Sequence, residues 1–156
     1  MAAKTIPIKG EMVPPIVDGG LFHIAKVTVG SNGSTGNDVL VPTEAATTAL
    51  FNVKAGTIVH EVLAKVVTAY TGSAAITLGD SDDAAGWMQA ANLACTVISS
   101  ELKTSRNVLL TTALTADLNA YGAGKIYSAD QDINVVSGAS NLVGQMDVYL
   151  VYSRVG

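Results

Sequence analysis

The stretch "QMDVYLVYSRV", residues 145–155, indicates the fold class more clearly than any other part of this chain. Its side chains alternate with a period of two, so that an extended backbone would carry apolar residues on one face and mostly polar residues on the other. Such alternation is typical of a β-strand with one side against a hydrophobic core. The apolar face consists of Met146, Val148, Leu150 and Tyr152, and the opposite face of Gln145, Asp147, Tyr149 and Ser153.

Short segments rich in β-branched residues precede this strand, and Gly, Ser, Asn and Asp separate them as turn formers. A turn about every ten residues is typical of a two-sheet architecture rather than of helices. The sequence therefore predicts an all-β, single-domain β-sandwich or jelly roll whose body covers residues 21–156. The expected strands are 21–29, 39–41, 49–53, 57–70, 74–78, 107–114, 125–129, 133–136 and 145–155.

Segment 57–70 also fits a helix, because its apolar residues repeat with helical spacing and Glu61 and Lys65 would form an i,i+4 pair. Its many β-branched residues and the flanking Gly56 and Gly72 favour a strand instead. We prefer the strand and leave the helix open. On a regular strand, one face would carry Ile58, Val62, Ala64, Val66 and Tyr70.

Residues 1–20 are expected to form an extended N-terminal arm. This segment has no hydrophobic periodicity and contains three of the four prolines, Pro7, Pro14 and Pro15. It cannot bury enough apolar area by itself to offset about 1–2 kcal/mol of backbone entropy per ordered residue. We therefore expect the arm to be mobile unless a neighbouring surface orders it.

Composition points to a protein that buries much of its surface against other chains. Charged residues make up 14% of the 156 residues, well below the roughly 25% usual for soluble domains. The net charge of −4 argues against a nucleic-acid binder, because such a surface would not neutralise phosphates. Cys95 is the single cysteine, so no internal disulfide is expected. With no secretory signal or long apolar run, we expect a soluble protein made in the cytoplasm that does not enter a membrane.

The acidic stretch "GDSDDAAGW", residues 79–87, is the first candidate for a binding site. An EF-hand calcium loop needs oxygen ligands at positions 1, 3 and 5, Gly at position 6 and Glu at position 12. When Asp80 is taken as position 1, those last three places are filled by alanines. The stretch is therefore interpreted as a solvated turn after a strand, with no metal bound. The three alanines are Ala84, Ala85 and Ala91.

No other pattern in the sequence favours an enzyme. His23 and His60 each lie in an apolar run without a second ligand at metal-site spacing, and on a strand His60 and Glu61 would face opposite sides. The glycines of 30–36 and 121–125 lack the spacing of phosphate-binding loops, and no G-x-S-x-G motif is present. We expect no catalytic, cofactor-binding or metal-ligating residue, and no cofactor. Trp87 and the five tyrosines could be considered as a sugar-stacking platform, but Tyr149 and Tyr152 would lie on opposite faces of one strand and cannot share it. Core or interface packing is expected for at least one of them.

Two longer stretches resemble the capsid decoration, or cement, proteins of tailed bacteriophages, which have a β-sandwich or jelly-roll body. These stretches are "VTAYTGSAAITLGDSDDAAGWM" (67–88) and "YSADQDINVVSGASNLVGQMDVYLVYS" (127–153). In that family a strand leads into a "GD-x-D-D-x-x-G-aromatic" turn, and a late unit forms the closing hairpin. The matching positions are Gly79, Asp80, Asp82, Asp83, Gly86 and Trp87, then Asp132, Ile133, Val135, Gly138, Gly144, Val148, Leu150 and Tyr152.

The resemblance implies a structural virion protein without enzymatic activity. As a member of that family the chain would bind the outer surface of a phage capsid as a homotrimer and stabilise joins between major capsid subunits, with residues 1–20 lying along neighbouring subunits. It would be made in the host cytoplasm and reside in the virion. The alternative is a receptor- or glycan-binding module of a phage fibre or surface protein.

Overall fold

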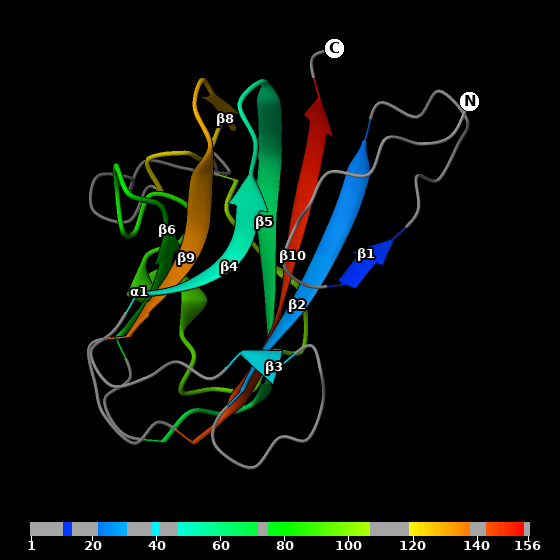
Figure 1. The fold of residues 1–156 in the computed structure, drawn as a ribbon. Coiled ribbons are helices and arrows are strands. Elements are labelled where there is room, and N and C mark those ends of the chain that lie inside the picture. The colour runs from blue at the N-terminus through cyan, green and yellow to red at the C-terminus, as the bar shows by residue number, and fades with distance from the viewer. Residues whose placement is uncertain are drawn as a thin grey trace.

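Two β-sheets stack face to face and enclose the hydrophobic core, which confirms the predicted all-β sandwich (Figure 1). The computed structural model describes residues 11–13, 22–30, 39–40, 47–71, 75–106, 119–137 and 143–154. Among these residues, no helix is both long and apolar enough to cross a membrane.

The larger sheet has seven strands, with β10 between β2 and β5. Its order is β1-β2-β10-β5-β7, with β3 also on β2 and β8 also on β5. The pairs are antiparallel except for the parallel contact of β3 with β2. The strands are β1 (Glu11–Val13), β2 (His23–Gly30), β3 (Val39–Leu40), β5 (Thr57–Thr68), β7 (Lys103–Thr104), β8 (Lys125–Tyr127) and β10 (Gln145–Arg154).

The smaller sheet has three antiparallel strands in the order β4-β9-β6. They are β4 (Thr47–Val53), β9 (Gln131–Ser137) and β6 (Ile76–Gly79). A single helical turn, α1 (Ala90–Leu93), follows β6 and packs beside it. β9 and β10 therefore lie in different sheets, so the closing hairpin implied by the family resemblance is wrong: the chain crosses from one sheet to the other between them.

Most of the predicted strands are present. Segment 57–70 forms β5 rather than a helix, which settles the alternative left open above. The predicted strand 107–114 lies outside the described residues. Two strands were not predicted, β1 and β7, because three and two residues are too short to show alternation. β1 belongs to the predicted arm, where it pairs with β2, and the rest of that arm lies outside the described residues.

A bulge in β5 makes the predicted buried face of this strand partly wrong. Across from it, Val151 pairs with Glu61 but Tyr152 pairs with Val59, so His60 is an extra residue in the ladder. The bulge shifts the alternation by one position. Val59 is therefore buried in place of Ile58, and neither His60 nor Glu61 turns into the core. The buried residues of β5 are Thr57, Val59, Val62, Ala64 and Val66.

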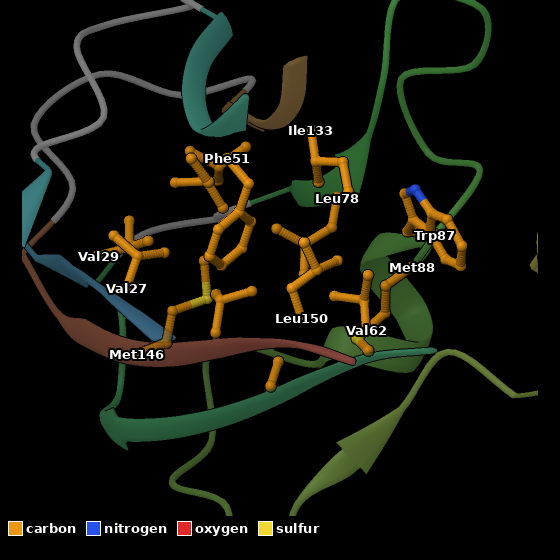
Figure 2. Packing of buried hydrophobic residues seen from close by; sticks show 14 of the residues in the cluster. Val27, Val29, Phe51, Val62, Leu78, Trp87, Met88, Ile133, Met146 and Leu150 are labelled. Atoms are coloured by element: carbon orange, nitrogen blue, oxygen red, sulfur yellow. The ribbon is translucent and has the colours of Figure 1, made fainter. Parts of the chain in front are cut away.

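The core is built from the inner faces of both sheets (Figure 2). Every residue of the predicted apolar face of β10 is buried, which confirms that interpretation. Trp87 and Met88, from the loop after β6, are also fully buried. The labelled core residues are Val27, Val29, Val62, Met146 and Leu150 from the larger sheet, Phe51, Leu78 and Ile133 from the smaller sheet, and Trp87 and Met88.

Candidate functional site: the acidic loop

The acidic loop, residues 79–87, is a tight reversal of the chain after β6. The chain returns so closely that the backbone N–H of Met88 donates to the carbonyl of Leu78 at 2.8 Å. At the turn itself, the N–H of Asp80 donates to the carbonyl of Asp83 at 2.9 Å. A Cβ on Gly79 would lie 2.1 Å from the Asp83 carbonyl oxygen. The loop therefore requires glycine at this position for steric reasons.

The Asp80 carboxylate points into the protein, and its side chain is fully buried. Its Oδ2 accepts hydrogen bonds from the Lys125 ammonium at 2.6 Å and from the Tyr127 hydroxyl at 2.8 Å. Both partners come from β8, at the outer edge of the larger sheet. This one carboxylate therefore ties the loop that follows the smaller sheet to the edge of the larger one.

The other oxygen, Oδ1, is held mainly by the loop itself. It accepts from the backbone N–H groups of Asp82 at 3.0 Å and Asp83 at 3.2 Å, and from the Tyr121 hydroxyl at 3.1 Å. With the two donors on Oδ2, the buried charge has both an opposite charge and a full set of hydrogen bonds. A buried carboxylate needs both, since otherwise its desolvation would outweigh its interactions.

Lys125 is enclosed by aromatic rings and carboxylates. Its Nζ lies 4.3 Å from the ring centroid of Tyr121 and 4.9 Å from that of Tyr127, distances at which a cation is attracted to the ring face. The same nitrogen donates to Asp82 at 2.8 Å. Two carboxylates therefore share one ammonium, and only that of Asp82 reaches solvent, with 59% of its side chain exposed.

Trp87 links this cluster to the core. Its indole N–H donates to the Tyr127 hydroxyl at 2.9 Å, and its ring meets the Tyr121 ring edge-on, with the centroids 5.2 Å apart. A Cβ on Gly86 would lie 2.3 Å from the Tyr121 ring. The glycine before the tryptophan is thus explained by the tyrosine that packs against it.

These contacts set the charge states of the cluster. Burial alone would raise the pKa of Asp80, but the hydrogen bonds from Lys125, Tyr127 and the loop backbone outweigh it and lower that pKa. For Lys125, burial would lower the pKa, and the two carboxylates outweigh it and raise the pKa. Burial and the Asp80 charge both raise the pKa of Tyr127. Near neutral pH the cluster is therefore a stable ion pair with neutral tyrosines.

The contacts of this site hold the acidic loop against β8. The oxygens of Asp80 are occupied by donors of the chain itself, and within the described ranges no three His, Cys, Asp or Glu side chains come together to hold a metal. The turn and its glycines were predicted from the sequence, whereas the partners Lys125, Tyr121 and Tyr127 were not. The signal was present in "YGAGKIY", which places two tyrosines and a lysine within seven residues.

The ion pair predicts how stability depends on pH. The lowered pKa of Asp80 gives stabilisation that is complete above the unfolded value of about 3.9 and is lost as the pH falls through the lower folded value. The raised pKa values of Lys125 and Tyr127 give stabilisation that is complete below about pH 10 and is lost as the pH rises further. We expect melting temperatures to decrease below about pH 4 and above about pH 10, and the acid decrease to be smaller in Asp80→Asn. An equally steep acid decrease in that variant would contradict this assignment.

Calcium is not expected to stabilise the protein. A ligand that binds only the folded state raises the melting temperature, and the oxygens of Asp80 are already occupied by Lys125, Tyr121 and Tyr127. Thermal melting in calcium chloride and in a chelator should give the same midpoint. A rise of several degrees with calcium would show a specific site and overturn this prediction.

The two histidines lie in the larger sheet, away from the acidic loop. The Nε2 of His60 lies 2.8 Å from the Ser153 hydroxyl, and its ring contacts Phe22 edge-on. Burial, and next the charge of Arg106, lower the pKa of His60. His23 stacks on Tyr152 with centroids 5.2 Å apart. Both histidines therefore pack against neighbouring side chains on the strands, and the structure does not bring them together with the carboxylates of the loop.

The remaining sequence candidates also have structural roles where they are described. Trp87 and Tyr152 are fully buried, and Tyr149 lies on the opposite, partly exposed face of β10. These placements confirm that Tyr149 and Tyr152 cannot share a binding platform. The stretch 121–125 is a turn that leads into β8. Most of the glycine-containing stretch 30–36 lies outside the described residues.

Comparison with solved structures finds a similar fold in a chain of one phage capsid. A chain of the cyanophage Pam1 capsid asymmetric unit aligns with a TM-score of 0.54 and 16% sequence identity, over 99% of this chain and 95% of that one. A chain from the acidic-stable capsid structure of Helicobacter pylori bacteriophage KHP30 aligns with a TM-score of 0.46 and 13% identity, over 85% and 87% of the two chains. No protein-family model and no curated protein matches the sequence. The likeness to the cyanophage chain shows a shared fold.

Proposed function

We propose that this chain is a structural, non-enzymatic virion protein. In this proposal it binds the outer surface of a phage capsid as a homotrimer and stabilises joins between major capsid subunits. The observation that carries the proposal is the fold shared with a phage capsid chain over nearly the whole length of both chains. The protein would be made in the host cytoplasm and reside on the capsid.

Three properties of the chain support a role based on buried surface rather than catalysis. Its charged fraction of 14% is low for a protein surrounded by water. In the part of the chain that the structure describes, the buried carboxylate of Asp80 is engaged by internal hydrogen bonds from Tyr121, Lys125 and Tyr127. The described residues also expose large apolar side chains, among them Phe22 and Ile126, as expected for a protein whose surface is buried against other chains.

The proposal is tested with phage heads that lack this protein. Heads are assembled from the major capsid protein of the phage that encodes this chain, incubated with the purified chain and pelleted. We expect the chain to pellet with the heads in saturable amounts, to appear on their outer surface by electron microscopy and to raise the temperature at which they break. Failure to pellet with intact heads at micromolar concentration would overturn the proposal.

The role of the predicted arm can be tested by a truncation that removes none of the described strands. Because Glu11–Val13 form β1, removal of residues 2–10 leaves every described strand in place. We expect this truncation to leave the melting temperature almost unchanged and to weaken binding to heads, since the arm would contribute contacts only there. Undiminished binding would show that the arm is not a tether.

A further inference from the structure

The two outer faces of the sandwich differ in character. The outer face of the smaller sheet is mostly polar, and Asn52 donates to Asp132 across it at 2.9 Å. The outer face of the larger sheet carries partly exposed apolar side chains on all three long strands, although the outer face of an antiparallel sheet in water is usually polar. We call this surface the apolar face. It contains Phe22, Ile24, Ile58, Leu63, Ile126, Tyr149 and Val151.

Four charged side chains on the apolar face form two ion pairs. Lys26 lies 3.2 Å from Asp147, which also accepts from the Thr28 hydroxyl at 2.8 Å. Farther along, Arg106 lies 3.8 Å from Glu61, and Thr104 donates to the same carboxylate. Covering this face would therefore leave few isolated charges in a dry contact, which is the condition under which burial of charged groups is tolerated.

A second apolar surface runs along the outer edge of β5. Residues 97–102 lie along this edge and are held there by Ser99. The N–H of Ser99 donates to the Val66 carbonyl at 3.0 Å, and its hydroxyl accepts from the Val66 N–H at 3.2 Å. The side chains on either side of Ser99 are turned outward. We call this surface the apolar edge. It contains Val97, Ile98 and Leu102, which are 63%, 62% and 50% exposed, and the exposed Glu101.

We propose that the apolar face binds the apolar edge of a second copy of this chain. The inference rests on the proposed homotrimer and identifies its contact surfaces. A closed ring of three joins two different surfaces of each copy rather than one surface to itself. The chain carries two such surfaces, adjacent to each other across β5, so that a copy can use its face toward one neighbour and its edge toward the other.

Area supports a chain-to-chain contact here. The larger sheet is five strands wide at about 4.8 Å per strand. The β2–β10 ladder has eight paired positions at about 3.4 Å each. The resulting area, roughly 24 by 27 Å or about 650 Å², is of the same order as the roughly 800 Å² per partner that a stable protein contact buries.

Charge supports a second copy as the occupant. The apolar face holds three cations, Lys26, Lys65 and Arg106, against two anions, Asp147 and Glu61. The chain as a whole carries a net charge of −4, so the remainder of each copy is more acidic than the total. Electrostatic repulsion between two copies is therefore smallest when the apolar face of one copy meets a different, more acidic surface of the other. Glu101 on the apolar edge has the sign that complements this excess.

Matched substitutions on the central strand of each sheet test the proposal. Val151→Lys alters the apolar face, and Val136→Lys makes the same change on the outer face of the smaller sheet. Ile98→Lys alters the apolar edge. Light scattering of the full chain at micromolar concentration should give about three times the chain mass for the wild type and Val136→Lys. Val151→Lys and Ile98→Lys should each be shifted to monomer, with circular dichroism confirming that they fold.

A mixture of the two interface variants separates this arrangement from a symmetric contact. The Val151→Lys variant has an unaltered apolar edge, and the Ile98→Lys variant has an unaltered apolar face. The mixture should therefore form dimers that contain one copy of each variant. A folded Val151→Lys variant that keeps the wild-type mass, a Val136→Lys variant that dissociates equally, or a mixture that stays monomeric would each overturn the proposal.

The head-binding assay tests the proposed virion role independently of the trimer contact. If the wild type is monomeric but pellets with heads, the inference fails and the virion role stands. If the wild type forms the predicted trimer but does not bind heads, the contact surfaces stand and the virion role fails.

Discussion

Replacement of Asp80 by alanine is expected to lower the free energy of unfolding by about 3–5 kcal/mol, the usual effect of removing one partner of a buried ion pair. The variant would leave Lys125 enclosed by two aromatic rings without its buried counterion. It would also leave the Tyr127 hydroxyl and two backbone N–H groups of the loop without their acceptor. For a chain of this size each kcal/mol corresponds to about 2–4 °C of melting temperature.

Asp130→Ala is the matched control for this experiment. Asp130 also pairs with a lysine, at 2.7 Å from the Lys54 Nζ, but 54% of its side chain is exposed. Exposed pairs contribute little to stability, because water solvates both partners when the contact is lost. Denaturant titrations of both variants measure the difference directly. Equal destabilisation by the two substitutions would show that the Asp80 cluster has no special structural role.

Replacement of Trp87 by alanine should have an effect of similar size. The side chain is fully buried between the two sheets beside Met88 and Leu78 (Figure 2). Large-to-small substitutions of buried aromatic residues cost about 3–5 kcal/mol, because they lose apolar burial and leave a cavity. Trp87→Ala would in addition remove the indole donor to Tyr127. We expect the unfolding midpoint in denaturant to decrease accordingly.

Trp87→Phe separates packing from hydrogen bonding. Phenylalanine keeps most of the apolar volume but cannot donate to the Tyr127 hydroxyl, and a typical hydrogen bond contributes about 1 kcal/mol. The phenylalanine variant should therefore retain much more stability than the alanine variant. If both substitutions lower stability equally, the hydrogen bond to Tyr127 rather than the packing is the main contribution of Trp87.

The parts of this fold that could be predicted from sequence are those governed by local pattern. The period-two alternation of β10 correctly identified its buried face, since register and burial both follow from backbone geometry. In β5 the same rule failed at Ile58, because a bulge at His60 inserts one residue into the ladder. A bulge is set by the partner strand, and nothing in the local sequence of β5 marks it.

Local sequence patterns also could not predict the contacts of the candidate site, because these join residues that are far apart in the sequence. The aspartates of residues 80–83 were visible as a turn, and the failure of the calcium pattern was visible as well. The partner Lys125 lies 45 residues farther along the chain, where the predicted glycine turn 121–125 meets the predicted strand 125–129. Spacing within one segment cannot show that two segments meet. The bond between Asp80 and Lys125 became apparent only once β8 was placed on β5.

The position of β10 has a consequence for synthesis of the protein. β10 is the last described strand in chain order, yet it lies between β2 and β5, and both of its edges are paired. While the polypeptide is being made on the ribosome, β2 and β5 therefore lack the strand that joins them. Contacts of such long sequence separation form slowly, and exposed apolar strand edges invite aggregation in the meantime. The folding rate of a full-length nascent chain should thus be limited by the docking of residues 145–154. Polypeptides released before β10 has been synthesised would be prone to aggregate.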